Sequence, residues 1–432
     1  MNLITRWILH EGKDREKQNM IWNMAGSFCY ALASMVLAFL VMRIIGPDEG
    51  GIFSFAFSTF GQQMFLVAYF GIRPFQITDG VGQYSFGDYR RQRIWTCGLA
   101  VVLAMAYLLL GTGSTYSFEK IQVVFLMVIY KVIDGWADVY ESEFQRNGRL
   151  YLTGKSNFFR TLLSVGCFLA ALVATHNLVP ACLIAVGAQA VGVLVFDIMT
   201  MHRLDAIDWR SETGQIRTLF QNTVLLFISV FLDFYIFSAS KYAIDRYLTD
   251  ADSGYFNMIF MPTSVINLVA GFVIRPFLTR MTKQWNDREF SALKSQIVRL
   301  GGMIAGLSVL AVGGTVILGK PVLQLLEMLL GSAYSGKLTG HHLAFVLIVS
   351  GGSCYAFLNL MYYVLVIMRK QKAIFVVYAL VSIVAWFLCP VMVQAAGIPG
   401  AAVAYLILMI LLAVGFGGLV WIAYCRSVDG RD

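Results

Sequence analysis

The tetrapeptide Ile-Arg-Pro-Phe occurs twice in the chain, at residues 72–75 and 274–277, and each copy closes a long apolar segment. Two further matches have nearly the same spacing: Gln18-Asn19 with Gln221-Asn222, and Gly51-Ile52-Phe53 with Gly254-Tyr255-Phe256. The offset is 202 residues for the tetrapeptide and 203 for the other two matches. Coincidence within apolar sequence is the alternative, but arginine and proline are scarce in such segments. The pattern therefore predicts a chain built from two related halves.

The apolar segments themselves indicate a membrane protein. Hydrophobic residues make up 58% of the chain and charged residues 13%, against about 25% charged residues in soluble domains. Runs long enough to cross a bilayer recur along the whole sequence, and the first is too long for a signal peptide. We expect an all-α polytopic fold with twelve spans, near residues 20–42, 51–72, 94–111, 120–141, 158–176, 178–199, 219–243, 254–274, 296–318, 341–367, 373–394 and 398–424.

The basic residues predict the orientation of these spans. With the N-terminus inside the cell, 26 of the 33 lysines and arginines fall at or near cytoplasmic ends of spans. This asymmetry follows the positive-inside rule, so both termini are expected in the cytoplasm and the protein in the cell membrane. The formal net charge of +8 is thereby explained by topology, and nucleic acid is not expected as a partner.

The two halves are expected to be six-helix bundles, 1–205 and 206–432. An even number of spans gives both halves the same orientation, as in parallel repeats related by an axis along the membrane normal. The boundary is expected in the polar stretch 201–217. The longest external segment, 319–340, is expected to hold a short amphipathic helix at residues 321–327 that lies on the membrane surface.

Enzymatic sites are poorly represented. Seven cysteines are unclustered and lie in or beside apolar segments, as expected of small buried hydrophobes. Residues 149–156 resemble a phosphate-binding loop, but Arg149 replaces its first glycine and no strand precedes it. His341 and His342 are adjacent, so they point about 100° apart on a helix and cannot chelate one metal ion. We therefore expect neither a metal site nor catalysis.

The fourth span carries the richest set of polar residues. Lys131, Asp134, Asp138, Glu141 and Gln145 follow one helical face. Lys131 lies roughly 16 Å from the external end of this span, near the middle of the bilayer. Such residues usually face a water-filled path, although Lys131 and Asp134 have the spacing to neutralise each other as a packed pair. We predict that Lys131 binds substrate and that Asp134 and Asp138 are candidates for binding a coupling ion.

Two other spans carry polar residues on one face. The seventh has Asp233 near mid-depth and Lys241 toward its outer end. Because no opposite charge lies within a turn of Asp233, its partner must come from another span or the carboxyl is protonated. Asp233 is therefore our first candidate for a proton or cation site. In the first span, Asn23 and Tyr30 share a polar face and Arg43 ends the segment; with Lys241, these are candidate substrate-binding residues.

Arg73 and Arg275 come from the two tetrapeptides, and each is followed by proline at the cytoplasmic end of a span. Anchoring at the interface is one interpretation. The other is that the two guanidinium groups meet across the repeat axis and bind phosphate. We list both as candidate substrate-binding residues. Pro262 is expected to kink the eighth span, because proline removes a backbone donor.

The segment that follows the first span, Ile44-Ile45-Gly46-Pro47-Asp48-Glu49-Gly50-Gly51-Ile52-Phe53, resembles the polysaccharide and O-unit (Wzx-like) flippases. These belong to the multidrug/oligosaccharidyl-lipid/polysaccharide (MOP) exporter superfamily. Residues 144–150 followed by Arg160 are similar to the loop between spans four and five of those proteins. The twelve-span plan extends the resemblance over most of the chain, while the specific motifs lie within the first 160 residues.

The resemblance implies two six-helix bundles in a V around a central cavity that opens alternately to each side. It also implies translocation of an undecaprenyl-diphosphate-linked oligosaccharide from the inner to the outer leaflet during polysaccharide or lipopolysaccharide synthesis. Other polysaccharide-assembly proteins are implied as partners, and no cofactor beyond a proton or sodium gradient. The alternative function is an ion-coupled multidrug exporter of the MATE type. A membrane-embedded glycan polymerase or transferase is less favoured, since the external loops are short.

Overall fold

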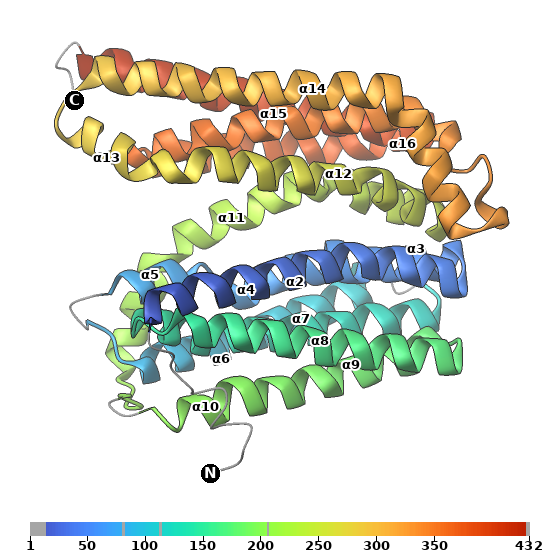
Figure 1. The fold of residues 1–432 in the computed structure, drawn as a ribbon, viewed down its shortest axis with the longest axis horizontal. Helices are drawn as coiled ribbons and strands as arrows, with labels where there is room; N and C mark the ends of the chain where they lie inside the picture. The colour runs from blue at the N-terminus through green and yellow to red at the C-terminus, as the bar shows by residue number, and fades with distance from the viewer. Residues whose placement is uncertain (1–13, 80–82, 112–114, 205–206, 429–432) are drawn as a thin grey trace. The chain divides into compact units, whose positions relative to one another are not determined.

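A computed structural model describes residues 14–79, 83–111, 115–204 and 207–428, which form helices and their connections without a strand. The chain divides into two compact units, Met1–Phe231 and Leu232–Asp432. Both units consist of long helices that run side by side (Figure 1). The fold is therefore all-α, as the sequence predicts.

The first unit contains the helices as far as the first part of α11. Its elements are α2 (Arg15–Ile45), α3 (Pro47–Phe55), η1 (Ala56–Phe60), α4 (Gly61–Tyr69), α5 (Ile72–Thr78), α6 (Phe86–Ala106), η2 (Tyr107–Gly111), α7 (Phe118–Arg146), α8 (Leu150–Thr175), α9 (Leu178–Gly192), η3 (Val193–Ile198) and α10 (Met199–Met201). Helix α7 packs against α4, α6 and α9, and α2 packs along α8. Most polar residues of α7 are consequently enclosed by neighbouring helices.

The glycine-proline turn behind the family resemblance has a clear structural role. Gly46 ends α2 with a φ of 108°, a conformation that favours glycine. Pro47 then occupies the first turn of α3, where its missing N–H costs no helical hydrogen bond. The pair therefore joins the first two spans through one sharp turn. Further on, Ser85 and Asp88 form a capping box that starts α6.

Helix α11 (Thr213–Tyr247) begins in the first unit and ends in the second. The other elements of the second unit are α12 (Asp250–Ile274), η4 (Arg275–Phe277), α13 (Leu278–Asn286), α14 (Phe290–Leu330), η5 (Ser332–Tyr334), η6 (Thr339–His341), α15 (His342–Ile367) and α16 (Gln371–Val428). Helix α15 packs against α12, α14 and α16.

Ten segments of the described chain are long and apolar enough to cross a membrane. Helix α7 is absent from this set because it carries too many charges, although it is 29 residues long. Helix α16 contains a non-helical residue, Gly397, with a φ of 60°, so two spans meet there. With α7 counted and α16 divided, these segments account for the twelve predicted spans.

The prediction for residues 319–340 is wrong in one respect. The segment 321–327 is not a separate surface helix, because α14 continues through Pro321 to Leu330. The apolar sequence after Pro321 extends the helix. Glu327 near its end accepts hydrogen bonds from the backbone N–H groups of Gly336, Leu338 and Thr339 at 2.6–3.0 Å. This carboxylate folds the connection to α15 back onto α14.

The predicted boundary between 205 and 206 falls on two residues outside the described ranges. The division between the compact units comes later, at Phe231, because the first part of α11 packs on the first unit. There Phe227 stacks on Phe70 with ring centroids 4.1 Å apart. Gln92 also donates a hydrogen bond to Thr223. Whether the two halves are repeats in three dimensions stays a prediction.

Candidate functional site

The polar face of α7 lies inside the first unit and is surrounded by arginines. Asp134, Asp138 and Glu141 are each less than 9% exposed. They face guanidinium groups from three other helices. We call this set the arginine–carboxylate cluster; it comprises Arg73, Arg93, Arg160, Asp134, Asp138, Glu141 and Asp197.

Two arginines hold Asp138 from opposite sides. Arg73 Nη1 lies 2.7 Å from Asp138 Oδ1, and Arg93 Nη2 lies 2.8 Å from Asp138 Oδ2. Arg73 also donates to Gln145 at 2.9 Å, and Arg93 donates to the carbonyl oxygen of Ala68 at 2.9 Å. Asp138, a predicted coupling-ion candidate, is thus paired on both oxygens.

Arg160 of α8 connects the remaining carboxylates. Its Nη2 lies 2.8 Å from Asp134 Oδ1 and 2.9 Å from Glu141 Oε1, and its Nη1 lies 2.9 Å from Asp197 Oδ2. Ser156 completes the arrangement by donating to Asp197 at 2.6 Å. Charge-assisted contacts of this kind are strong in the protein interior. Through them, Arg160 of α8 holds α7 and η3 against its own helix.

This arrangement revises the interpretation of the fourth span. Asp134 pairs with Arg160 and, within the described chain, forms no salt bridge to Lys131, so the alternative of a neutralising pair inside α7 is not observed. The carboxylates of the stripe are buried and contact arginines of other helices. A water-filled path along this face stays a prediction.

Lys131 is buried beside the arginine–carboxylate cluster and is 2% exposed. Its ammonium donates to the hydroxyl of Tyr30 at 2.9 Å and to Gln62 Oε1 at 3.0 Å. The same ammonium lies 4.0 Å from the ring centroid of Phe57, a geometry that stabilises a cation through the ring face. Two of the predicted substrate-binding residues, Lys131 and Tyr30, are therefore in direct contact.

The other predicted residues of the first span are further from this lysine. Arg43 is exposed in the last turn of α2. Asn23 is half-buried, and its backbone lies where α2 crosses α8: a Cβ added at Gly154 would meet Asn23 N at 2.6 Å. The structure does not bring Asn23 or Arg43 into contact with Lys131.

In the second unit, Asp233 of α11 has a tyrosine as its partner. Tyr355 of α15 donates its hydroxyl to Asp233 Oδ2 at 2.8 Å. The other carboxyl oxygen is buried without a hydrogen bond, and Asp233 forms no salt bridge with any described residue. The expected partner from another span exists, but it is a neutral phenol rather than a cation.

Lys241 lies two turns further along α11 and is 7% exposed. Its ammonium lies 4.2 Å from the ring centroid of Phe260, and within the described residues it has no salt bridge or hydrogen bond. Phe260 follows Phe57 by 203 residues, the offset of the sequence repeat. In each unit a buried lysine therefore lies on the ring of a phenylalanine, and the two phenylalanines occupy matching positions of the sequence repeat.

The arginines of the repeated tetrapeptide have different surroundings. Arg73 belongs to the arginine–carboxylate cluster at the start of α5. Arg275 lies in η4 after α12, exposed and without a salt bridge within the part of the chain described. Arg73 is therefore not a free interfacial anchor. The meeting of the two arginines stays a prediction, as does the kink at Pro262.

Three residues of the cluster are not predicted as site residues by the sequence patterns: Arg93, Arg160 and Asp197. In the sequence, Arg93 is one of the basic residues at cytoplasmic ends, and Arg160 is one of them and also follows the loop motif at residues 144–150. Asp197 offered a usable signal, since an acidic residue within a predicted span is costly unless it is paired. It is fully buried, and it identifies η3 as part of the cluster.

No protein-family model matches the chain, and none of the curated proteins matches it. Solved structures do. A lipid II flippase, MurJ, in an inward closed conformation has a TM-score of 0.70 at 11% identity, covering 94% of this chain and 89% of that one. A Vibrio cholerae MATE transporter has a TM-score of 0.61 at 14% identity, over 100% and 99% of the two chains.

An outward-facing multidrug resistance MATE family transporter of the MOP superfamily gives a TM-score of 0.60 at 12% identity, over 99% of both chains. Because the sequence identities are this low, these comparisons show a shared fold and nothing about function. The chain therefore has the fold that a MOP superfamily MATE transporter and a lipid II flippase share, and its many apolar helices are those of a multi-pass membrane protein.

Proposed function

We propose that the protein is a flippase that moves a lipid-diphosphate-linked oligosaccharide from the cytoplasmic to the outer leaflet of the cell membrane by alternating access. In this proposal both termini lie in the cytoplasm, and the lipid carrier is undecaprenyl diphosphate. The fold supports the class of transport, because the lipid II flippase shares it with a TM-score of 0.70.

The observation that carries the proposal is the pair of buried lysines. Lys131 and Lys241 lie within spans, and neither forms a salt bridge with a described residue. A buried cation without a counter-ion is unfavourable, so an anion that reaches it is bound strongly. A diphosphate crossing the bilayer needs such groups, because hydrocarbon alone opposes its passage.

Asp233 is the proposed coupling site. It is a carboxyl at mid-span that accepts a hydrogen bond from Tyr355 and lies close to a second tyrosine, Tyr378, without a cation beside it in the described chain. Protons or sodium ions that bind it in one conformation and leave in another would link occupancy to opening. Asp134 and Asp138 are less suited to this role, since Arg160, Arg73 and Arg93 already neutralise them.

A MATE-type multidrug exporter is the second candidate. The observation that favours it is length: the two MATE structures are covered over 99% of their chains, whereas the flippase is covered over 89%. An exporter of organic cations is expected to expose acidic groups to its substrate. Within the described chain, however, the cluster carboxylates are paired to arginines.

The test is a translocation assay in proteoliposomes with a fluorescent undecaprenyl-diphosphate-linked oligosaccharide. A membrane-impermeant quencher reports how much lipid reaches the opposite leaflet. We expect transport by the wild-type protein, none by Lys131→Ala, and partial transport by Lys131→Arg. Normal protein levels and membrane insertion of Lys131→Ala are the control.

The same vesicles loaded with a cationic dye distinguish the second candidate. Dye movement driven by an ion gradient, without lipid translocation, would identify an exporter. Asp233→Asn keeps the size of the side chain but cannot titrate, so it is expected to bind substrate and to lose gradient-driven accumulation. Full gradient dependence in Asp233→Asn would remove this residue from the mechanism.

A further inference from the structure

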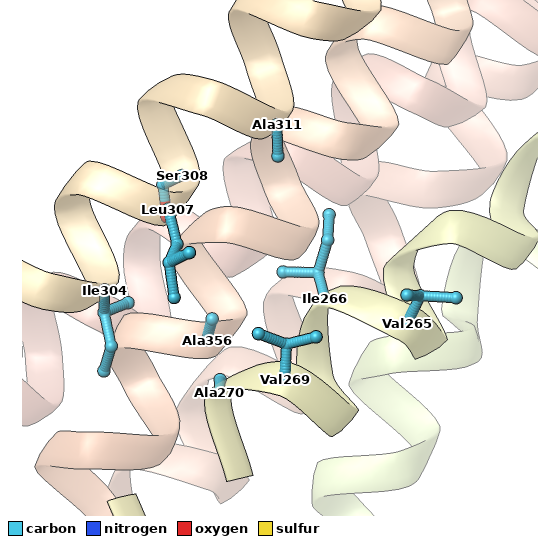
Figure 2. A pocket seen from close by; sticks show the side chains of 9 residues that line it. All are labelled: Val265, Ile266, Val269, Ala270, Ile304, Leu307, Ser308, Ala311 and Ala356. Carbon is cyan, nitrogen blue, oxygen red and sulfur yellow. The ribbon is translucent and has the colours of Figure 1, made fainter. Parts of the chain in front are cut away.

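An apolar groove opens on the second unit between α12 and α14, with α15 as its floor (Figure 2). Its volume is about 240 Å³. Side chains from α12, including Ile266 and Val269, face side chains from α14, including Ile304 and Leu307. The groove runs along helices that are long and apolar enough to span the membrane, so a lipid chain is an occupant of matching chemistry.

The lining selects a hydrocarbon ligand. Ser308 is the one polar residue among the described residues that line the groove. Sugars and ions would lose their hydration here without gaining hydrogen bonds, which is unfavourable. A flexible hydrocarbon chain, by contrast, gains contacts with the walls. Ala311 and Ala356 leave the room that such a chain needs.

A basic helix follows the α12 wall of the groove along the chain. Helix α13 follows α12 after η4 and packs against α14 and α15, the helices that form the far wall and the floor. Met281 and Gln284 are buried on one side of α13, while Arg280 and Lys283 are exposed on the other. Neither cation forms a salt bridge with a described residue. The basic-residue pattern assigns this helix to the cytoplasmic side.

The spacing between the apolar groove and the cations of α13 fits the length of a lipid. Groove residue Ala270 lies ten positions before Arg280, roughly 15 Å if the rise of a helix is applied. Arg275, also exposed, lies between them. A lipid whose chain occupies the groove therefore places its head group near Arg275, Arg280 and Lys283. Three cations suit a diphosphate better than the single charge of a phospholipid phosphodiester.

We propose that this groove holds a segment of the polyprenyl chain of the lipid-linked substrate while Arg280 and Lys283 hold its diphosphate at the cytoplasmic surface. The groove is a loading site, distinct from the buried lysines. This inference rests on the proposed function and deepens it, since it names the surface where the carrier lipid first binds. The chain stays in apolar surroundings and only the head group moves.

The test measures binding of undecaprenyl diphosphate to the purified full-length protein by native mass spectrometry. Ala311→Trp fills the groove from α14 and is expected to weaken binding at least tenfold, about the effect of losing a few buried methylene groups. Leu310→Trp is the matched control: Leu310 is its neighbour on α14, is 73% exposed and does not line the groove. It is expected to bind like wild type. Ser308→Phe fills the same space if Ala311→Trp does not accumulate.

The head-group prediction uses a second pair of ligands. Replacing both Arg280 and Lys283 with alanine is expected to weaken binding of undecaprenyl diphosphate several-fold and binding of uncharged undecaprenol little. Phosphatidylglycerol is the competitor. Displacement of undecaprenyl diphosphate by an equal concentration of phosphatidylglycerol would show a site for ordinary membrane lipid and overturn the proposal.

Binding by Ala311→Trp and Ser308→Phe at the wild-type level would equally overturn it. The translocation assay separates this failure from that of the proposed function. If wild-type protein and groove variants all translocate the lipid-linked oligosaccharide at the same rate, the flippase function stands and the groove has no part in it. If the wild-type protein translocates none, the function itself is wrong.

Discussion

Two buried cations, one in each unit, differ in what surrounds them. Arg160 of the first unit is 3% exposed and lies within 2.9 Å of three carboxylates. Lys241 of the second unit is 7% exposed, its ammonium lies 4.2 Å from the ring centroid of Phe260, and it forms no salt bridge with a described residue. Paired charges fasten helices together, whereas an unpaired buried charge stays available to a ligand. Burial by itself therefore does not identify a transport residue.

The repeated tetrapeptide shows why the units differ. Arg73 pairs with Asp138 and Glu141 of α7. Helix α15, which packs beside α12 in the second unit, contains no aspartate or glutamate between His342 and Ile367. Arg275 consequently has no buried carboxylate on α15 to meet and lies exposed. Within the described residues, the arginine of the repeated tetrapeptide is therefore paired in the first unit and without a salt bridge in the second.

The largest effect is expected from Arg160→Met. Removing this guanidinium leaves three buried carboxylates without their shared cation, which costs about 3–5 kcal/mol for a broken buried pair. The variant is expected to accumulate poorly and to unfold at a lower temperature in detergent. A variant as stable as wild type would show that the cluster does not hold the first unit together.

A smaller effect is expected where α2 and α8 cross. A Cβ added at Gly154 would lie 2.2 Å from the carbonyl carbon of Trp22, so Gly154→Ala forces the two backbones apart at about 1–3 kcal/mol. The control from the second unit is Gly302→Ala in α14, where no atom lies within 4 Å of the new Cβ. There alanine is expected to stabilise the helix by up to about 1 kcal/mol. Equal effects of the two changes on the unfolding temperature would contradict this difference.

The first unit also has an ion pair outside its spans, between Asp79 and Arg146. Burial opposes ionisation of Asp79, but backbone N–H groups of Tyr84 and Gln83, together with Arg146, outweigh it and lower the pKa of this carboxyl. A lowered pKa stabilises the fold above the pKa of the unfolded chain, about 3.9, and this contribution is lost as the pH falls through the folded value.

Asp79→Asn is therefore expected to be less stable than wild type at about pH 7 and nearly equal to it well below about pH 4. Unfolding temperatures of both proteins in detergent across this range provide the measurement. A difference in unfolding temperature that stays constant with pH would mean that the charge of Asp79 does not contribute to stability.

The smallest effect on stability is expected for Lys241→Met. The substitution removes a buried charge that has no counter-ion and keeps much of the side-chain volume, so stability is expected to stay constant or rise. Comparing Lys241→Met with Arg160→Met shows the effect of replacing a buried cation by methionine in each of the two units. A loss as large as that of Arg160→Met would show that Lys241 has a structural partner after all.

The sequence predicted the helices well, because apolar runs, capping residues and the Gly46-Pro47 turn are local features. It also placed Lys131, Asp134 and Asp138 on one face of α7. It did not predict their partners: Arg160 and Asp197 come from other helices, and no spacing rule along one helix reveals such contacts. The apolar residues beyond Pro321 led to a wrong prediction. A separate surface helix was expected to start at this proline, but Pro321 lies inside α14.

The central claim is that unpaired buried lysines receive the diphosphate of a lipid-linked oligosaccharide. The most direct test compares wild-type protein with Lys241→Met in the proteoliposome translocation assay, at matched protein amounts and after equal unfolding temperatures are verified. We predict translocation by the wild type and a loss of at least tenfold in Lys241→Met. A tenfold loss corresponds to about 1.4 kcal/mol, and the loss of one charge contact exceeds that energy. Translocation by Lys241→Met at the wild-type rate would contradict the claim.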